Sequence, residues 1–148
     1  MATDYSRGDC PAPLVDAVHE GLGEDVGCHL QVVADDAITT LEQLSEQEKD
    51  PLYNTLKVSL CKIGSVYQAL LMCKHAKLRN NWSIIVGIED DSCIETNDTF
   101  IADFAVGVGA GQFNGGGFES GEYISKYSRI LDITREDGSI AYCGKKFR

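Results

Sequence analysis

The sequence predicts an α+β fold in which N-terminal helices and one long central helix pack against a C-terminal antiparallel β-meander of about four strands. Apolar residues recur at helical spacing in the first half of the chain, and the spacing changes to two after Asn81. Asp137-Gly138, a strong two-residue hairpin signal, separates the last two expected strands. Helices followed by hairpin-connected strands are typical of an α+β domain.

The central helix is expected from about residue 51 to residue 79. Asp50 is a suitable N-cap, and Pro51 suits the first helical position, where its missing N–H leaves no hydrogen bond unmade. The apolar residues that recur at steps of three and four are Leu52, Leu56, Leu60, Ile63, Tyr67, Leu70 and Leu71. The opposite side of this helix is also largely apolar, so we expect neighbouring elements to cover two of its faces.

The other elements follow from the same patterns. Before the central helix we expect a loose arm over residues 1–12, a short helix over 13–22, a segment at 24–34 that is either strand or helix, and a second helix ending near residue 49. Asp35 and Asp36 are interpreted as caps of this second helix. The expected strands cover residues 82–89, 99–108, 122–135 and 140–147. Nothing in the composition divides the chain, so residues 1–148 are expected to form a single domain.

Composition limits the classes of function. The net charge is −10, which argues against direct binding to nucleic acid or to anionic membranes. The chain starts without a secretion signal and contains no apolar run of membrane-spanning length. Its six cysteines form no CxxC pair. We therefore expect a cytoplasmic protein in a reducing compartment, with mostly buried thiols.

An acidic segment is the first candidate site. No lysine or arginine occurs between Arg79 and Lys126. The acidic residues proposed to bind a partner are Glu89, Asp90, Asp91, Glu95 and Asp98. They lack the spacing of a calcium-binding EF-hand loop, so no metal site is predicted. A basic protein or nucleoprotein surface is the expected partner, and a solvated acidic loop is the simpler interpretation.

A glycine-rich segment at residues 107–121 is the second candidate site. Glycines allow backbone amides to approach a ligand closely, but neither the P-loop pattern nor GxGxxG is complete here. The candidate loop and ligand residues are Gly109, Gly111, Phe113, Gly116, Phe118, Glu119 and Glu122. The two phenylalanines are either anchors for a partner or part of the core, and the two glutamates form a possible acid/base pair.

No motif identifies an enzyme, and no cofactor is predicted. The preferred interpretation is a small acidic protein-binding module, an inhibitor or immunity-type protein that occupies a basic surface. The first alternative is a small-molecule-binding protein or enzyme that uses the loop at 107–121. The second alternative is a structural or assembly subunit that forms homo-oligomers.

Overall fold

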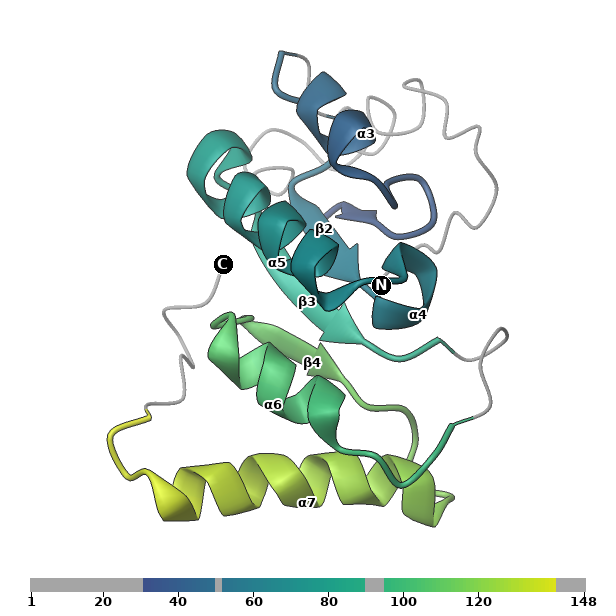
Figure 1. The fold of residues 1–148 in the computed structure, drawn as a ribbon, viewed down its shortest axis with the longest axis vertical. Helices are drawn as coiled ribbons and strands as arrows, with labels where there is room; N and C mark the ends of the chain where they lie inside the picture. The colour runs from purple at the N-terminus through teal and green to yellow at the C-terminus, as the bar shows by residue number, and fades with distance from the viewer. Residues whose placement is uncertain (1–30, 50–51, 90–94, 141–148) are drawn as a thin grey trace, which may run out of the picture.

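The computed structural model describes residues 31–49, 52–89 and 95–140 and shows an α/β fold built on a parallel sheet (Figure 1). Within this part of the chain the sheet has four strands in the order β1-β2-β3-β4. The strands are β1 (Val33–Ala34), β2 (Thr55–Val58), β3 (Ser83–Gly87) and β4 (Gln112–Asn114). Every neighbouring pair is parallel. All four carboxyl ends therefore lie at one edge of the sheet.

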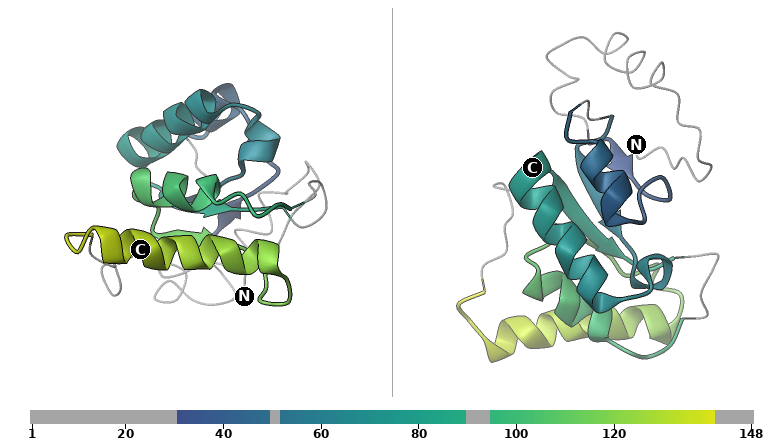
Figure 2. Two further views of the ribbon diagram at one scale, coloured as in Figure 1. Left: turned by 60° about the horizontal axis from the view of Figure 1, so that its bottom comes forward. Right: turned by 45° about the horizontal axis from the view of Figure 1, so that its top comes forward.

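Helices alternate with the strands along the chain. They are α3 (Leu41–Glu46), α4 (Leu60–Ile63), α5 (Val66–His75), the π-helix η1 (Ala76–Asn80), α6 (Phe100–Gly107) and α7 (Gly121–Glu136). In Figure 1, α5 and α6 lie over the same face of the sheet, and the two views in Figure 2 show α7 running past α6 at one end of the molecule. Repeated βα units of this kind produce a parallel sheet covered by helices.

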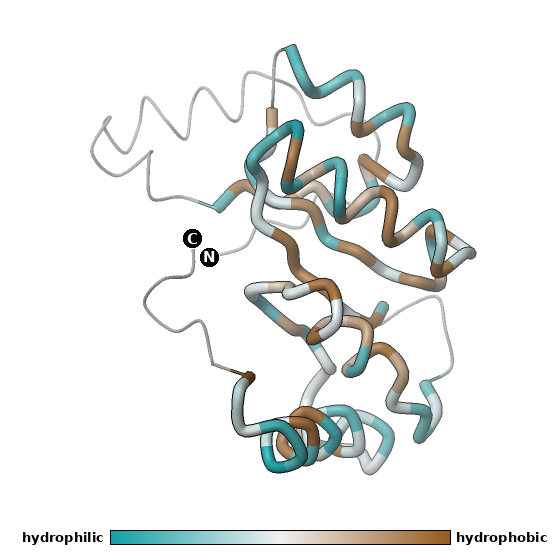
Figure 3. The backbone as a smooth tube through the Cα atoms, turned by 60° about the vertical axis from the view of Figure 1, so that its left-hand side comes forward, coloured by the Kyte–Doolittle hydropathy of each residue, from teal (hydrophilic) through white to brown (hydrophobic). Residues whose placement is uncertain are grey.

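The core lies between the two central strands and α5. Leu56 of β2, Ile84 of β3 and Met72 of α5 are each at most 1% exposed. Figure 3 shows the hydrophobic stretches along the strands, whereas the helices alternate between hydrophobic and hydrophilic residues. Strands of a parallel sheet that are buried on both faces read as continuous apolar runs, so they do not show the alternation of a half-exposed strand.

The predicted antiparallel meander is wrong. Residues 99–108 and 122–135 form helices α6 and α7, and only the strand expected at 82–89 is confirmed, as β3. The apparent alternation in α6 arose because this helix is apolar on most sides, where it packs on β3, β4 and α7. In α7 the buried residues are Lys126 and Ile133, two helical turns apart. The strand expected at 140–147 lies outside the described residues except for Ile140, which is not in a strand.

The single central helix is also wrong. Its first third contains strand β2, and the remainder is divided into α4, α5 and η1. Gly64 has a left-handed backbone with φ of 77° and ends α4 after one turn, which glycine does without steric strain. Thr55 and Val58 are β-branched residues, which favour a strand. Leu52, Leu56 and Leu60 stand at helical spacing, but they lie before β2, in β2 and in α4, so the spacing does not come from one helix.

The N-terminal predictions are tested only in part. The second helix exists as α3, shorter than expected, and its N-cap is Thr40 in a capping box with Gln43. Asp35 and Asp36 are therefore not its caps. Val33 and Ala34, at the end of the ambiguous segment, form β1. The predicted arm at 1–12 and helix at 13–22 lie outside the described residues.

None of the helices in the described ranges is long and apolar enough to cross a membrane.

We predict that Leu56→Ala lowers the free energy of unfolding by about 2–5 kcal/mol, because Leu56 is fully buried in β2 and its truncation leaves a cavity. Leu131→Ala is the matched control, since Leu131 is 57% exposed on α7 and should change stability by less than about 0.5 kcal/mol. Urea unfolding followed by circular dichroism measures both. Equal effects of the two substitutions would contradict the position of β2 in the core.

Candidate active site at the carboxyl ends of the strands

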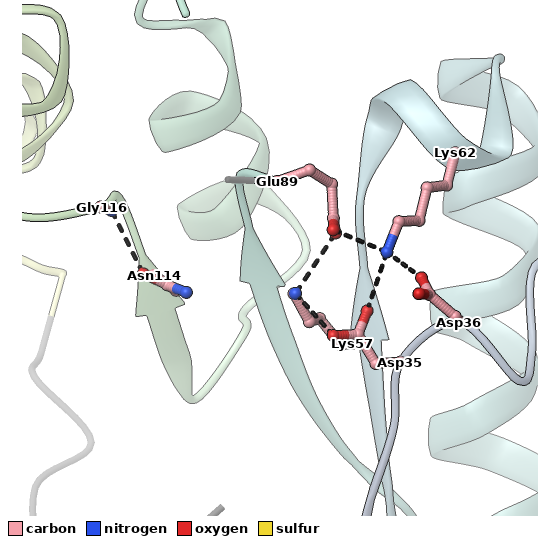
Figure 4. A network of polar contacts seen from close by, with 7 residues as sticks. All are labelled: Asp35, Asp36, Lys57, Lys62, Glu89, Asn114 and Gly116. Carbon is pink, nitrogen blue, oxygen red and sulfur yellow. Dashed lines mark hydrogen bonds and ion pairs between the residues drawn. The ribbon is translucent and has the colours of Figure 1, made fainter. Parts of the chain in front are cut away.

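Charged side chains gather where β1, β2 and β3 end (Figure 4). Asp35 and Asp36 directly follow β1, and Lys57 is the penultimate residue of β2. Glu89 lies two residues beyond β3, and Lys62 comes from α4, just after β2. These five residues are called the strand-end cluster below. The parallel pairing of the three strands brings them to one edge of the sheet.

Lys57 is held between carboxylates from the two neighbouring strands. Its Nζ donates to Asp35 Oδ2 at 2.7 Å and lies 3.3 Å from Glu89 Oε1. The second contact is an ion pair without hydrogen-bond geometry, since Glu89 Oε1 is buried and has no hydrogen-bond partner. The Lys57 and Asp35 side chains are each 17% exposed and that of Glu89 is 9% exposed. Lys57 is therefore positioned by carboxylates on both sides and retains some access to solvent.

Lys62 contacts every carboxylate of the cluster. Its Nζ lies 2.6 Å from Glu89 Oε2 and 3.3 Å from Asp35 Oδ1, and it also forms an ion pair with Asp36. A lysine ammonium has three N–H donors, and here each donor has a different carboxylate within reach. The ammonium of Lys62 is thus shared by all three acidic side chains.

The cluster keeps both lysines protonated. Partial burial lowers the pKa of Lys57, but the hydrogen bond and charge of Asp35 and the charge of Glu89 raise it, and the net result lies above the ordinary 10.5. For Lys62, burial again lowers the pKa, while the contacts with Asp36 and Glu89 raise it well above 10.5. With three carboxylates and two ammonium groups, the formal charge of the cluster is −1 near neutral pH.

Gly87 lies in close contact with the end of β4, beside the cluster. A β-carbon at this position would lie 3.1 Å from Asn114 Cβ and 3.7 Å from Lys57 Cε. The side chains of Lys57 and Asn114 therefore flank the same glycine. The Asn114 carboxamide oxygen accepts a hydrogen bond from Gly116 N at 3.2 Å, which holds the side chain at the strand end (Figure 4). A polar side chain from β4 thus borders the cluster on the side opposite β1.

Three carboxylates of the cluster form a possible donor set for a metal ion. Asp35, Asp36 and Glu89 each offer a carboxylate oxygen, and these atoms lie within 4.8 Å of one another. Oxygen donors of this type suit Mg²⁺ or Ca²⁺. However, Lys62 already contacts all three carboxylates, and Lys57 contacts two of them. A divalent ion would have to displace an ammonium group, so the cluster as arranged does not fit a metal.

The acidic segment predicted as a partner surface is used within the protein where it is described. Glu89 belongs to the strand-end cluster. Glu95 pairs with the buried Lys126 at 2.9 Å, and Asp98 accepts a hydrogen bond from Phe100 N at 2.9 Å at the start of α6. Asp90 and Asp91 lie outside the described residues. Glu89, Glu95 and Asp98 therefore each make a different intramolecular contact.

The glycine-rich segment includes β4 and the turn into α7. Tyr127 of α7 holds this turn, because its hydroxyl accepts from Gly115 N at 3.1 Å and donates to Gly116 O at 2.8 Å. The rings of Phe113 and Phe118 lie 5.8 Å and 5.0 Å from that of Tyr127, measured between centroids. Phe113 packs against the core, whereas Phe118 is 73% exposed. These glycines permit close packing on an aromatic side chain.

The remaining loop candidates lie apart from the cluster. Gly109 has a positive φ of 61°, and its carbonyl oxygen accepts from Lys77 Nζ at 2.9 Å. Gly111 directly precedes β4. Glu119 is exposed, and hydrogen bonds from its own backbone N–H and from Ser120 lower the pKa of Glu122. Neither glutamate contributes to the ion pairs of the strand-end cluster.

Sequence reasoning identified one member of the cluster, Glu89, and assigned it to a surface loop. It interpreted Asp35 and Asp36 as helix caps and placed Lys57 and Lys62 inside a helix. The signal that was missed is the repeated order of a short apolar segment, a charged residue and a helix. That order is typical of βα units whose functional residues follow the strands.

Successive βα units with charged side chains at the carboxyl ends of parallel strands place the chain in the α/β class, whose open-sheet and barrel members both carry their sites at these ends. Comparison with known proteins identifies the family within this class. The model of the enolase C-terminal TIM barrel domain matches residues 16–148. The chain belongs to the enolase family.

Individual relatives agree with this assignment. The enolase of Helicobacter hepaticus is 33% identical over 158 residues, an alignment that covers 98% of this chain and 36% of the relative. The enolase of Ureaplasma parvum serovar 3 is 39% identical over 109 residues, which cover 73% of this chain and 24% of the relative. The chain thus spans 36% or less of the length of these two relatives.

The family assignment corrects the functional interpretation. An inhibitor or immunity-type module and a non-enzymatic role are both wrong for a chain of this enzyme family. The alternative of a small-molecule-binding protein or enzyme agrees better with the match. This alternative used the loop at 107–121, whereas Lys57 and Lys62 of the strand-end cluster lie outside that loop.

We predict that Lys57→Met destabilises the protein by about 1–3 kcal/mol near neutral pH, because Asp35 and Glu89 lose a partner inside a partly buried cluster. The folded-state pKa of Lys57 is raised above 10.5, so its contribution is fully present below about pH 10.5 and is lost as the pH rises from there through the higher folded-state pKa. Urea unfolding at neutral and alkaline pH measures this difference. Lys74→Met, an exposed lysine on α5, is the control, and an equal effect there would contradict the prediction.

We also predict that Gly116→Ala destabilises the protein by more than about 1 kcal/mol. Gly116 has a φ of 86°, and an added β-carbon would lie 2.5 Å from the ring of Tyr123. Gly138→Ala is the matched control, since its β-carbon would have nothing within 4 Å and its φ is not in the left-handed region. Thermal unfolding of both variants distinguishes a packing role from a freely flexible loop. A negligible effect of Gly116→Ala would favour the flexible loop.

Proposed function

We propose that this chain carries the lysine-bearing part of an enolase-type lyase site. In this site the amine of Lys57 removes the proton from the carbon next to a substrate carboxylate. One observation carries the proposal: Lys57 lies at the carboxyl end of β2, between acidic side chains that follow β1 and β3. In βα-barrel enzymes the catalytic residues come from this end of the strands. Enolase-superfamily enzymes are themselves standard examples of proton abstraction by a lysine or histidine base.

The cluster gives Lys57 the position that such a step requires. Asp35 and Glu89 fix the ammonium from two sides, and Gly87 allows β4 to approach closely beside Lys57. Asn114 contacts the same glycine from β4 and offers a neutral amide for hydrogen bonding to a substrate oxygen. The neutral amine of Lys57 would take the proton, the electron pair of the broken C–H bond would form a double bond to the adjacent carbon, and the group on that carbon would leave with its own bonding pair. This is the general chemistry of a lyase acting next to a carboxylate.

Enolase-superfamily sites also use one or two Mg²⁺ ions to stabilise the enediolate. The strand-end cluster does not match that arrangement, because Lys62 contacts all three carboxylates that would bind the ion. No step is therefore assigned to a metal here. Positive charge near the reacting carboxylate is instead available from the ammonium of Lys62.

The cellular location and binding partners are separate from this proposal. A reducing, cytoplasmic location stays a prediction, and the buried Cys73, whose thiol pKa burial raises to about 11, suits it because the thiol is held in its protonated form. The predicted basic partner and self-association also stay untested.

The proposal predicts exchange of the proton on carbon 2 in D₂O for members of a panel of 3-hydroxycarboxylic acids, with and without a phosphoryl group. Lys57→Met should abolish this exchange, because the proposal assigns the transfer to the Lys57 amine, while Lys74→Met should retain it. Since the raised pKa of Lys57 leaves little neutral amine near neutral pH, the rate should increase as the pH approaches that pKa from below. Proton NMR of the acids measures the exchange. Exchange that is unaffected by Lys57→Met, or absent for the whole panel, would contradict the proposal.

A further inference from the structure

We propose that Lys62 is a built-in cation that takes the place of a divalent metal ion among Asp35, Asp36 and Glu89. Its catalytic consequence rests on the proposed function, because it would give an enolase-type site that does not depend on a metal. The structural claim itself concerns only cation binding, so it can be tested without any turnover.

The geometry of the three carboxylates supports this substitution. Their oxygens converge to within 4.8 Å, although Asp35 and Asp36 follow β1 and Glu89 follows β3. Three carboxylate oxygens from different side chains that face one point resemble the first coordination shell of a hard cation. At that point the structure has the Lys62 ammonium, in contact with all three.

The local backbone explains how Lys62 reaches this position. Lys62 lies on α4, a single helical turn between the end of β2 and the left-handed Gly64. Such a short turn places the residue next to the carboxyl edge of the sheet, where Asp35 and Asp36 also lie. The Lys62 side chain is 22% exposed, so the ammonium is partly enclosed by the cluster it neutralises.

Charge balance favours the lysine over an added metal ion. With both lysines in place the cluster has a formal charge of −1, and without Lys62 it would have −2. A divalent ion that entered beside Lys62 would meet a positive charge at contact distance, where Coulomb repulsion is strongest. The carboxylates also hold the pKa of Lys62 above 10.5, so the ammonium does not lose its charge near neutral pH.

The test is a titration of the full chain with Mn²⁺, followed by electron paramagnetic resonance of the free ion, with Mg²⁺ as competitor. At about 1 mM Mn²⁺, a concentration suited to weak oxygen-donor sites, the unaltered chain should show no saturable binding. Lys62→Met should bind one Mn²⁺ per chain at least about tenfold more tightly, and Mg²⁺ should displace it. Lys62→Arg, which preserves the charge, should behave as the unaltered chain.

Lys126→Met is the matched control, because Lys126 is a buried lysine paired with a different carboxylate, that of Glu95. It should not create a Mn²⁺ site. Saturable binding by the unaltered chain, or a folded Lys62→Met variant that binds no Mn²⁺, would overturn the proposal. If Lys62→Met fails to fold, the titration of the unaltered chain decides alone: no saturable binding supports the proposal and binding overturns it. Absence of proton exchange would contradict the proposed function and leave this result unchanged.

Discussion

Parallel pairing of β2 with β3 is the constraint on which the rest of the structure depends. Their register aligns Lys57 with Ile85 and Val58 with Val86, so both strands end at the same edge of the sheet. Glu89 then lies beside Lys57, although the two residues are far apart in sequence. An antiparallel pair would direct the two carboxyl ends to opposite edges, and the cluster would not form.

The strand-end cluster balances repulsion against attraction. Three carboxylates within 4.8 Å of one another repel strongly in a partly buried environment, and the two lysines offset that repulsion. The same contacts give the lysines their raised pKa values and fixed positions. The cluster combines several charged side chains with limited solvent access. Both active sites and structural ion-pair networks have these features. Membership of the enolase family supports the proposal that this cluster belongs to an active site.

The sequence indicated where many of the regular segments lie, but often not whether a segment is a helix or a strand. The strand at 82–89 was found because its burial alternates, with Ile84 and Val86 buried and Ile85 partly exposed. β2 was missed because it has only four residues, and its apolar Leu56 also fits the helical spacing of Leu52 and Leu60. α6 was mistaken for a strand because Phe100, Ala102 and Phe104 stand at every second position, although Ile101 between the first two is apolar as well.

The site was less predictable than the fold because it depends on contacts between distant segments. Asp35 and Lys57 are linked only by the pairing of β1 with β2, which no local pattern reveals. Glu89 was noticed for its charge, yet its partners Lys57 and Lys62 seemed to lie in a different element. Once β2 and β3 were known to be parallel strands, the charged residues at their carboxyl ends would have been the first candidates.

The most direct measurement is an NMR titration of the lysine side chains, in which the Cε resonances of Lys57 and Lys62 are followed through alkaline pH. If both ammonium groups lie among the three carboxylates, both will titrate above 10.5, and Asp35→Asn will shift both midpoints downward. Midpoints at or below 10.5, or no response to Asp35→Asn, would mean that the lysines do not share one cluster and would contradict the account of the site.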